Sequence, residues 1–162
     1  MKKMCIILIA CLLLAGCSAR ETFETVEDEF GQQQIAAPRQ MLLTLPENAA
    51  AQTVQSDYGQ RYFCDGYETT LQTMSAGNLN ATLRQLTGFG ADALTVVETG
   101  LTDNTRYECV WTAAGEGGDM VGRAVILDDG VYHYCMTAMA SADMAAQLRQ
   151  TWQDLFETFT LG

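Results

Sequence analysis

The chain has 162 residues, with twenty Asp and Glu against nine Lys and Arg, and its formal net charge is −11. Nucleic-acid binding depends on cations that neutralise phosphates, so a chain this acidic is not expected to bind nucleic acid. The length suits one folded domain with a substantial hydrophobic core.

The first sixteen residues have the layout of a secretory signal. Lys2 and Lys3 precede an apolar run from Met4 to Leu14, and small residues follow. The run is too short to span a bilayer, which needs about 20 apolar residues. An ordinary signal peptide and a short uncleaved anchor are the alternatives to the interpretation that follows.

The stretch Leu14-Ala15-Gly16-Cys17 resembles the lipobox of bacterial lipoproteins. The resemblance implies cleavage after Gly16 and a diacylglycerol group on the sulfur of Cys17. Two acyl chains, such as palmitate, give stable anchoring, whereas one chain is marginal. We therefore expect a protein held by lipid on a cell membrane and facing the extracytoplasmic side. Cleavage would remove the only two lysines and leave a formal charge of −13.

Residues 17–40 are predicted to be the lipidated cysteine and an acidic tether. Few apolar residues are present, so the segment has little to bury. Phe23, Val26 and Phe30 recur at helical spacing, which leaves open a short amphipathic helix that forms transiently or on a partner.

Residues 41–162 are predicted to form a globular α+β domain. Its first half contains a weak strand at 49–55, a hairpin of 58–64 and 67–74 around Asp65-Gly66, a helix that starts after Ser75 or Asn78 and ends at Gly88, and a strand at 93–98. Its second half contains a three-stranded antiparallel meander at 106–113, 120–127 and 131–138. Ser141 then begins a terminal helix with an apolar stripe of Met144, Leu148, Trp152, Leu155 and Phe159.

This order of elements, closing with the run from Trp152 to Phe159, resembles the PsbP-like α/β/α sandwich that many small bacterial lipoproteins share. The resemblance implies an antiparallel sheet packed against the C-terminal helix and a second helix. It also implies an accessory or binding role without catalysis, although fold alone does not fix function.

His133 is the only histidine and falls within a predicted strand. A catalytic histidine needs a nucleophile and an orienting carboxylate, and the spacing supplies neither. Cys64, Cys109 and Cys135 fall in strands and lack paired zinc-ligand spacing. Outside the cytoplasm Cys64 could bridge one of the other two, or all three could be free thiols.

The acidic turn residues Glu116, Asp119, Asp128 and Asp129 miss the calcium-loop pattern. No catalytic residue, cofactor or metal is therefore expected. The leading interpretation is a non-enzymatic binding or accessory module of the cell envelope, with an envelope protein or ligand as its partner. The alternative is an envelope enzyme or metal-dependent factor that uses His133 and the acidic loops.

Overall fold

The computed structural model describes residues 36–56 and 59–162, which belong to one compact unit, Ile35–Gly162. The lipobox, Cys17 and residues 18–35 of the predicted tether lie outside the described residues. None of the helices in the described part of the chain is long and apolar enough to cross a membrane.

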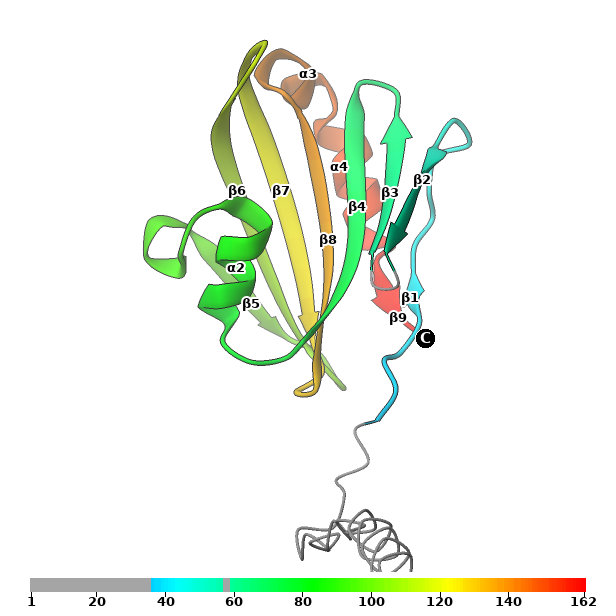
Figure 1. The fold of residues 1–162 in the computed structure, drawn as a ribbon, viewed down its shortest axis with the longest axis vertical. Helices are drawn as coiled ribbons and strands as arrows, with labels where there is room; N and C mark the ends of the chain where they lie inside the picture. The colour runs from blue at the N-terminus through cyan, green and yellow to red at the C-terminus, as the bar shows by residue number, and fades with distance from the viewer. Residues whose placement is uncertain (1–35, 57–58) are drawn as a thin grey trace, which may run out of the picture. The chain divides into compact units, whose positions relative to one another are not determined.

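A seven-stranded antiparallel sheet forms the centre of the domain (Figure 1). Its strands stand side by side in the order β2-β3-β4-β8-β7-β6-β5. Their bounds are β2 Ala50–Ser56, β3 Gly59–Cys64, β4 Tyr67–Ser75, β5 Val96–Gly100, β6 Thr105–Gly115, β7 Gly118–Asp128 and β8 Tyr132–Ser141. Two meanders, β2-β3-β4 and β5-β6-β7-β8, therefore meet where β8 pairs with β4. The predicted meander of three strands is confirmed within the second of them.

Helix α2, Leu79–Thr87, crosses between the two meanders and covers one face of the sheet (Figure 1). Asn78 begins it, and the Asn78 side chain accepts a hydrogen bond of 2.9 Å from the backbone N–H of Asn80. Gly88 ends it in the left-handed conformation at φ 82°, which a residue without Cβ adopts at low cost. Both ends of this helix agree with the sequence prediction.

The C-terminal segment covers the other face as two consecutive helices. These are α3, Ala142–Gln147, and α4, Arg149–Glu157, joined at Leu148. The prediction of one helix was wrong, because the backbone of Leu148, at φ −84° and ψ 3°, leaves the helical conformation and divides the segment. Ser141 precedes α3, but its side chain makes no capping hydrogen bond.

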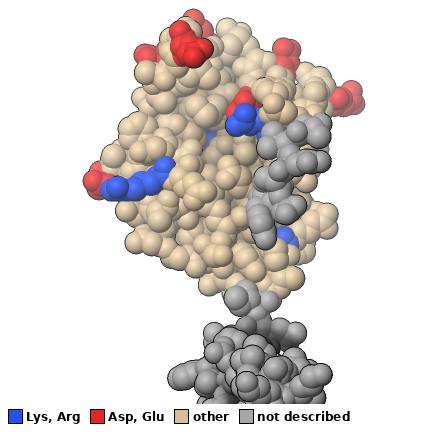
Figure 2. All heavy atoms as spheres, viewed as in Figure 1, with Lys and Arg blue, Asp and Glu red and all other residues tan. Residues whose placement is uncertain are grey.

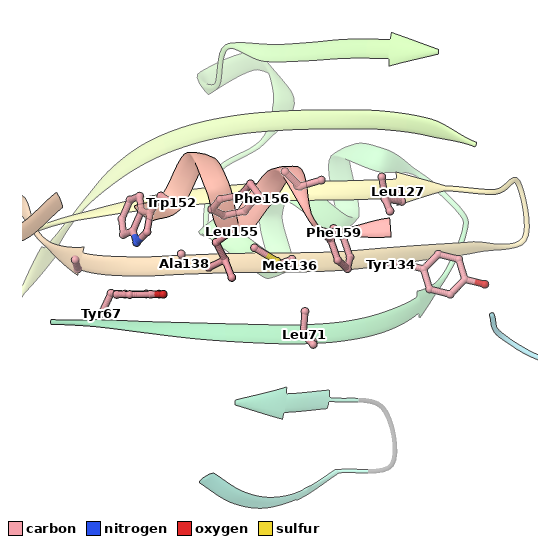
Figure 3. Close-up of a cluster of buried hydrophobic side chains, with 12 residues drawn as sticks. Tyr67, Leu71, Leu127, Tyr134, Met136, Ala138, Trp152, Leu155, Phe156 and Phe159 are labelled. Carbon is pink, nitrogen blue, oxygen red and sulfur yellow. The ribbon is translucent and has the colours of Figure 1, made fainter. Parts of the chain in front are cut away.

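Each face of the sheet carries its own core, because side chains alternate between faces along a strand. The α2 face buries Leu83 with Cys109, Trp111, Ala124, Ile126 and Cys135. The α4 face buries a larger cluster in which Trp152, Leu155, Phe156 and Phe159 meet residues of β4, β7 and β8 (Figure 3). The result is an α/β/α sandwich, so the predicted α+β fold class is confirmed.

A short second sheet joins the two ends of the described chain. Strand β1, Met41–Leu42, pairs with β9, Thr160–Leu161. Arg39, which the sequence analysis assigned to the tether, lies on the domain: its backbone N–H donates to the Tyr134 hydroxyl at 2.8 Å, and its side chain pairs with Asp103. Contacts of the folded domain therefore begin before residue 41.

Candidate binding surface

Helices α3 and α4 leave part of their sheet face uncovered. They pack over β4, β8 and β7, whereas β6 and β5 extend beyond them. Val110 on β6 and Val97 on β5 are each 57% exposed there. Two apolar side chains on adjacent strands thus face solvent on a sheet face that is buried elsewhere.

An arginine-carboxylate network lies between this uncovered area and α4. Glu108 accepts hydrogen bonds from Nε of Arg106 and from Nη2 of Arg123, both at 2.8 Å. Arg106 also donates to the carbonyl of Phe156 near the end of α4, at 3.0 Å. The Arg123 guanidinium lies 4.6 Å from the centre of the Phe156 ring, in a cation–π contact.

The network fixes the charge of Glu108. Burial by itself raises the pKa of this carboxyl group, but the hydrogen bonds from Arg106 and Arg123 outweigh burial and hold the pKa below the ordinary glutamate value. Glu108 is therefore ionised at neutral pH, and it joins two arginines that α4 also contacts.

Three hollows adjoin around Val110. One of about 390 Å³ lies between β6, β7 and the helices, and its lining includes Val121, Arg123 and Arg149. A second of about 380 Å³ lies over β5 and β6, between Val97 and Glu108. A third of about 340 Å³ lies where Phe89 and Leu94 approach Trp111. We call this area, centred on Val110, the β5–β6 surface.

In the folded domain His133 lies beside a hydroxyl and a carboxylate, the two kinds of neighbour that the sequence spacing did not supply. Its Nδ1 lies 2.7 Å from Oγ1 of Thr82 on α2, and its Nε2 lies 3.4 Å from a carboxylate oxygen of Asp128. A hydroxyl, an imidazole and a carboxylate are also the groups of a hydrolytic triad. Here His133 is 1% exposed and Thr82 is 6% exposed, so a substrate has no access. The three groups instead join α2 to the sheet.

Replacing His133 with alanine is expected to lower the free energy of unfolding by about 2–4 kcal/mol, because it opens a cavity and leaves the Thr82 hydroxyl without its partner. Urea denaturation measures the change. Thr82→Ser keeps the hydroxyl and should cost far less. An unchanged midpoint for His133→Ala, together with loss of an enzymatic activity, would instead favour the envelope-enzyme alternative.

The three described cysteines are free thiols. Cys64 packs against the α4-side core, whereas Cys109 and Cys135 belong to the α2-side core. Cys109 pairs with Ala124 on β7 and Cys135 pairs with Ile126, so two strand spacings and an offset of two residues place their Cα atoms roughly 12 Å apart. A disulfide needs Cα atoms about 4.4–6.8 Å apart. Burial raises the pKa of Cys135 to about 12, so its thiol stays protonated.

The acidic loop residues do not form one cluster. Glu116 and Asp119 lie at the β6–β7 hairpin, whereas Asp128 and Asp129 lie at the β7–β8 turn, at the other end of these strands. Asp129 accepts hydrogen bonds from the backbone of Val131 and Tyr132 and thus serves the turn itself. In residues 36–56 and 59–162, no group of three or more His, Cys, Asp or Glu side chains is placed to hold a metal ion.

Sequence reasoning missed the arginine network and the β5–β6 surface. Arg106, Glu108 and Val110 follow one another on one face of a predicted strand, which was a usable signal. Arg123 joins them only because Val110 pairs with Arg123 across β6 and β7. That register could not be read from the sequence.

No protein-family model matches the sequence, and a comparison with curated proteins also finds no match. Solved structures do share the fold. The solution structure of the cyanobacterial PsbP protein CyanoP from Synechocystis has a TM-score of 0.57 at 6% identity, over 75% of this chain and 86% of that one. A crystal structure from Bacteroides thetaiotaomicron has a TM-score of 0.51 at 10% identity and covers 75% of this chain. The match spans 45% of the Bacteroides chain.

A third structure, LpqN of Mycobacterium tuberculosis, is described as involved in cell envelope biogenesis. It superposes with a TM-score of 0.48 at 12% identity, over 78% of this chain and 86% of its own. The match to CyanoP shows that the domain has a PsbP-like α+β fold, as the sequence predicted. At these identities the likeness concerns the fold and leaves the function to be argued from this chain's own residues.

Proposed function

We propose that the protein is a lipid-anchored, extracytoplasmic module that binds an envelope protein or ligand without catalysis. The observation that carries the proposal is the run Leu14-Ala15-Gly16-Cys17 after a short apolar segment with two lysines. Acyl chains on Cys17 hold the protein at the membrane, and each buried methylene contributes about 0.8 kcal/mol.

The folded domain supports a binding role. The β5–β6 surface combines exposed apolar side chains with adjoining hollows, the kind of concave apolar area at which proteins bind partners. His133, the strongest candidate for catalysis, is sealed between α2 and the sheet. The acidic chain favours partners with positive charge and disfavours nucleic acid.

Cys17→Ala is expected to abolish labelling by radioactive palmitate and to move the protein from the membrane fraction to the soluble extracytoplasmic fraction. The reason is that no second anchoring signal accompanies the acyl chains in this proposal. The measurement is labelling in the producing cells, followed by fractionation and immunodetection.

Cys11→Ala is the matched control, because it removes a cysteine from the same N-terminal segment and should leave labelling and location unchanged. Equal labelling of the Cys17→Ala protein, or its unchanged retention in the membrane, contradicts the lipid anchor.

A further inference from the structure

Residues 110–115, the C-terminal half of β6, have no partner strand on the β5 side. Strand β5 pairs only with Thr105–Cys109, whereas β6 continues to Gly115. Strand β5 is the last strand of the sheet on this side. Residues 110–115 pair with β7 on one side, and among the described residues no backbone hydrogen bond reaches them from the β5 side. Six residues of strand thus lack a neighbour on one side.

The backbone groups at this edge point outward. In an antiparallel strand, the N–H and C=O of one residue face the same neighbour, and successive residues alternate between neighbours. The N–H of Leu101 donates to the carbonyl of Asn104 at 2.9 Å, so Asn104 faces the β5 side. Counting in twos, Val110, Thr112 and Ala114 face that side also.

The hairpin end of β6 gives the same alternation of backbone groups between the β5 side and the β7 side. Gly115 pairs with Gly118 across a two-residue turn, which directs the odd-numbered residues of β6 toward β7. The N–H and C=O groups of Val110, Thr112 and Ala114 are therefore available to another strand.

There is room for such a strand. The 340 Å³ hollow lies directly beside the edge, between Val110–Thr112 and the segment from Phe89 to Thr95 that bends away from it. Phe89 is 37% exposed there. Natural sheet edges are usually blocked by lysine, proline, a bulge or a covering segment. Residues 110–115 read Val-Trp-Thr-Ala-Ala-Gly and carry no charge or proline.

Four acidic side chains lie near the edge, whereas Arg123, opposite Val110 on β7, is already paired with Glu108. Glu116 and Asp119 lie at the β6–β7 hairpin, Asp92 lies in the short η1 helix Ala91–Ala93, and Glu98 lies on β5. None of the four forms an ion pair with any residue that the structure describes. Acidic atoms are visible at the hairpin end of the molecule in Figure 2. A second copy of this chain would bring the same negative charges together, whereas a basic segment complements them.

We propose that residues 110–115 of β6 bind an extended, basic segment of a partner protein, which adds to the sheet as a further strand. Main-chain hydrogen bonds to Val110, Thr112 and Ala114 hold the segment. Alternate side chains of the segment enter the hollow beside Trp111, and its flanking Lys or Arg residues face Glu116, Asp119 and Asp92. The inference rests on the proposed function, since it names the partner class of that binding module.

The test uses the purified full chain and a synthetic peptide, acetyl-Lys-Lys-Val-Thr-Val-Thr-Val-Lys-Lys-amide. Calorimetry gives the affinity, and two-dimensional NMR of the labelled protein locates the contact. The expected result is a shift of the amide signals of Val110, Thr112 and Ala114, with binding that weakens as salt is added. A peptide with glutamate in place of each lysine should bind at least about tenfold more weakly.

Thr112→Pro removes one outward N–H while the hydrogen bonds of β6 to β7 remain, and it should lower the affinity about tenfold. Thr112→Val keeps the N–H and should bind as the original protein does. The double variant Glu116→Gln and Asp119→Asn lies in an exposed hairpin, so it should keep the fold and lose most of the salt dependence. This variant tests the proposal even if Thr112→Pro does not fold.

Amide shifts confined to other strands, equal binding of the glutamate peptide, or no binding at millimolar peptide would each overturn the proposal. Self-association of the protein through Val110–Gly115 would overturn it also. The measurement does not depend on Cys17, so a protein that binds the peptide without carrying lipid would refute the anchor alone. A protein that carries lipid but does not bind the peptide would refute the strand addition alone.

Discussion

Replacing Phe156 with alanine is expected to lower the free energy of unfolding by about 3–5 kcal/mol, the usual range for a fully buried phenylalanine. Phe156 is 0% exposed and lies in the cluster that fixes α4 to the sheet (Figure 3). The substitution also removes the ring beneath the Arg123 guanidinium. The truncation therefore loses apolar contacts and a cation–π contact together.

Chemical denaturation followed by circular dichroism measures this change. Phe156→Leu keeps most of the buried volume and should cost much less. Gln153→Ala changes an exposed position of the same helix and should leave the midpoint nearly unchanged. A loss below about 1 kcal/mol for Phe156→Ala would contradict the packing of α4 on the sheet.

Gly122→Val is expected to destabilise the domain strongly, although valine is the better strand former. Gly122 on β7 lies directly opposite Trp111 on β6. A Cβ atom at position 122 would overlap with the Trp111 indole, which is only 5% exposed and belongs to the α2-side core. Overpacking a core by one methyl group costs about 1–3 kcal/mol, so Gly122→Ala should fall in that range and the valine variant above it.

A double-mutant cycle separates this overlap from the backbone effect of losing glycine. In a Trp111→Leu background the indole is absent, and the additional cost of Gly122→Ala should largely disappear. An equal cost in both backgrounds would show that overlap with the Trp111 indole is not the reason why position 122 requires glycine.

Local signals predicted most of the elements. Asn78 and Gly88 delimit α2 because a side-chain cap and a left-handed glycine act within one turn of the helix. The strand at 106–113 was visible as a period of two, and Asp65-Gly66 marked the separate hairpin of β3 and β4, with Gly66 at φ 79°. These features depend on neighbouring residues alone, so a single sequence contains them.

Features that depend on register or on distant pairing were not predictable. The sequence could not show that Leu127 pairs with Tyr134, which places Cys109 and Cys135 on one face. It could not show that α2 brings Thr82 to His133, 51 positions away. The open edge of β6 arises because β5 is short, and strand ends are set by tertiary packing.

The pairing of β1 with β9 determines how the domain would respond to tension. A pull along the chain from its N-terminal side would be transmitted first to Arg39 and then to a ladder of two residue pairs, Met41 with Leu161 and Leu42 with Thr160. These few hydrogen bonds would yield before the long ladders that join β4, β8, β7 and β6. The ladder of β1 and β9 would thus open first under tension, so a stretched chain would gain length on the N-terminal side of the domain while the seven-stranded sheet stayed intact.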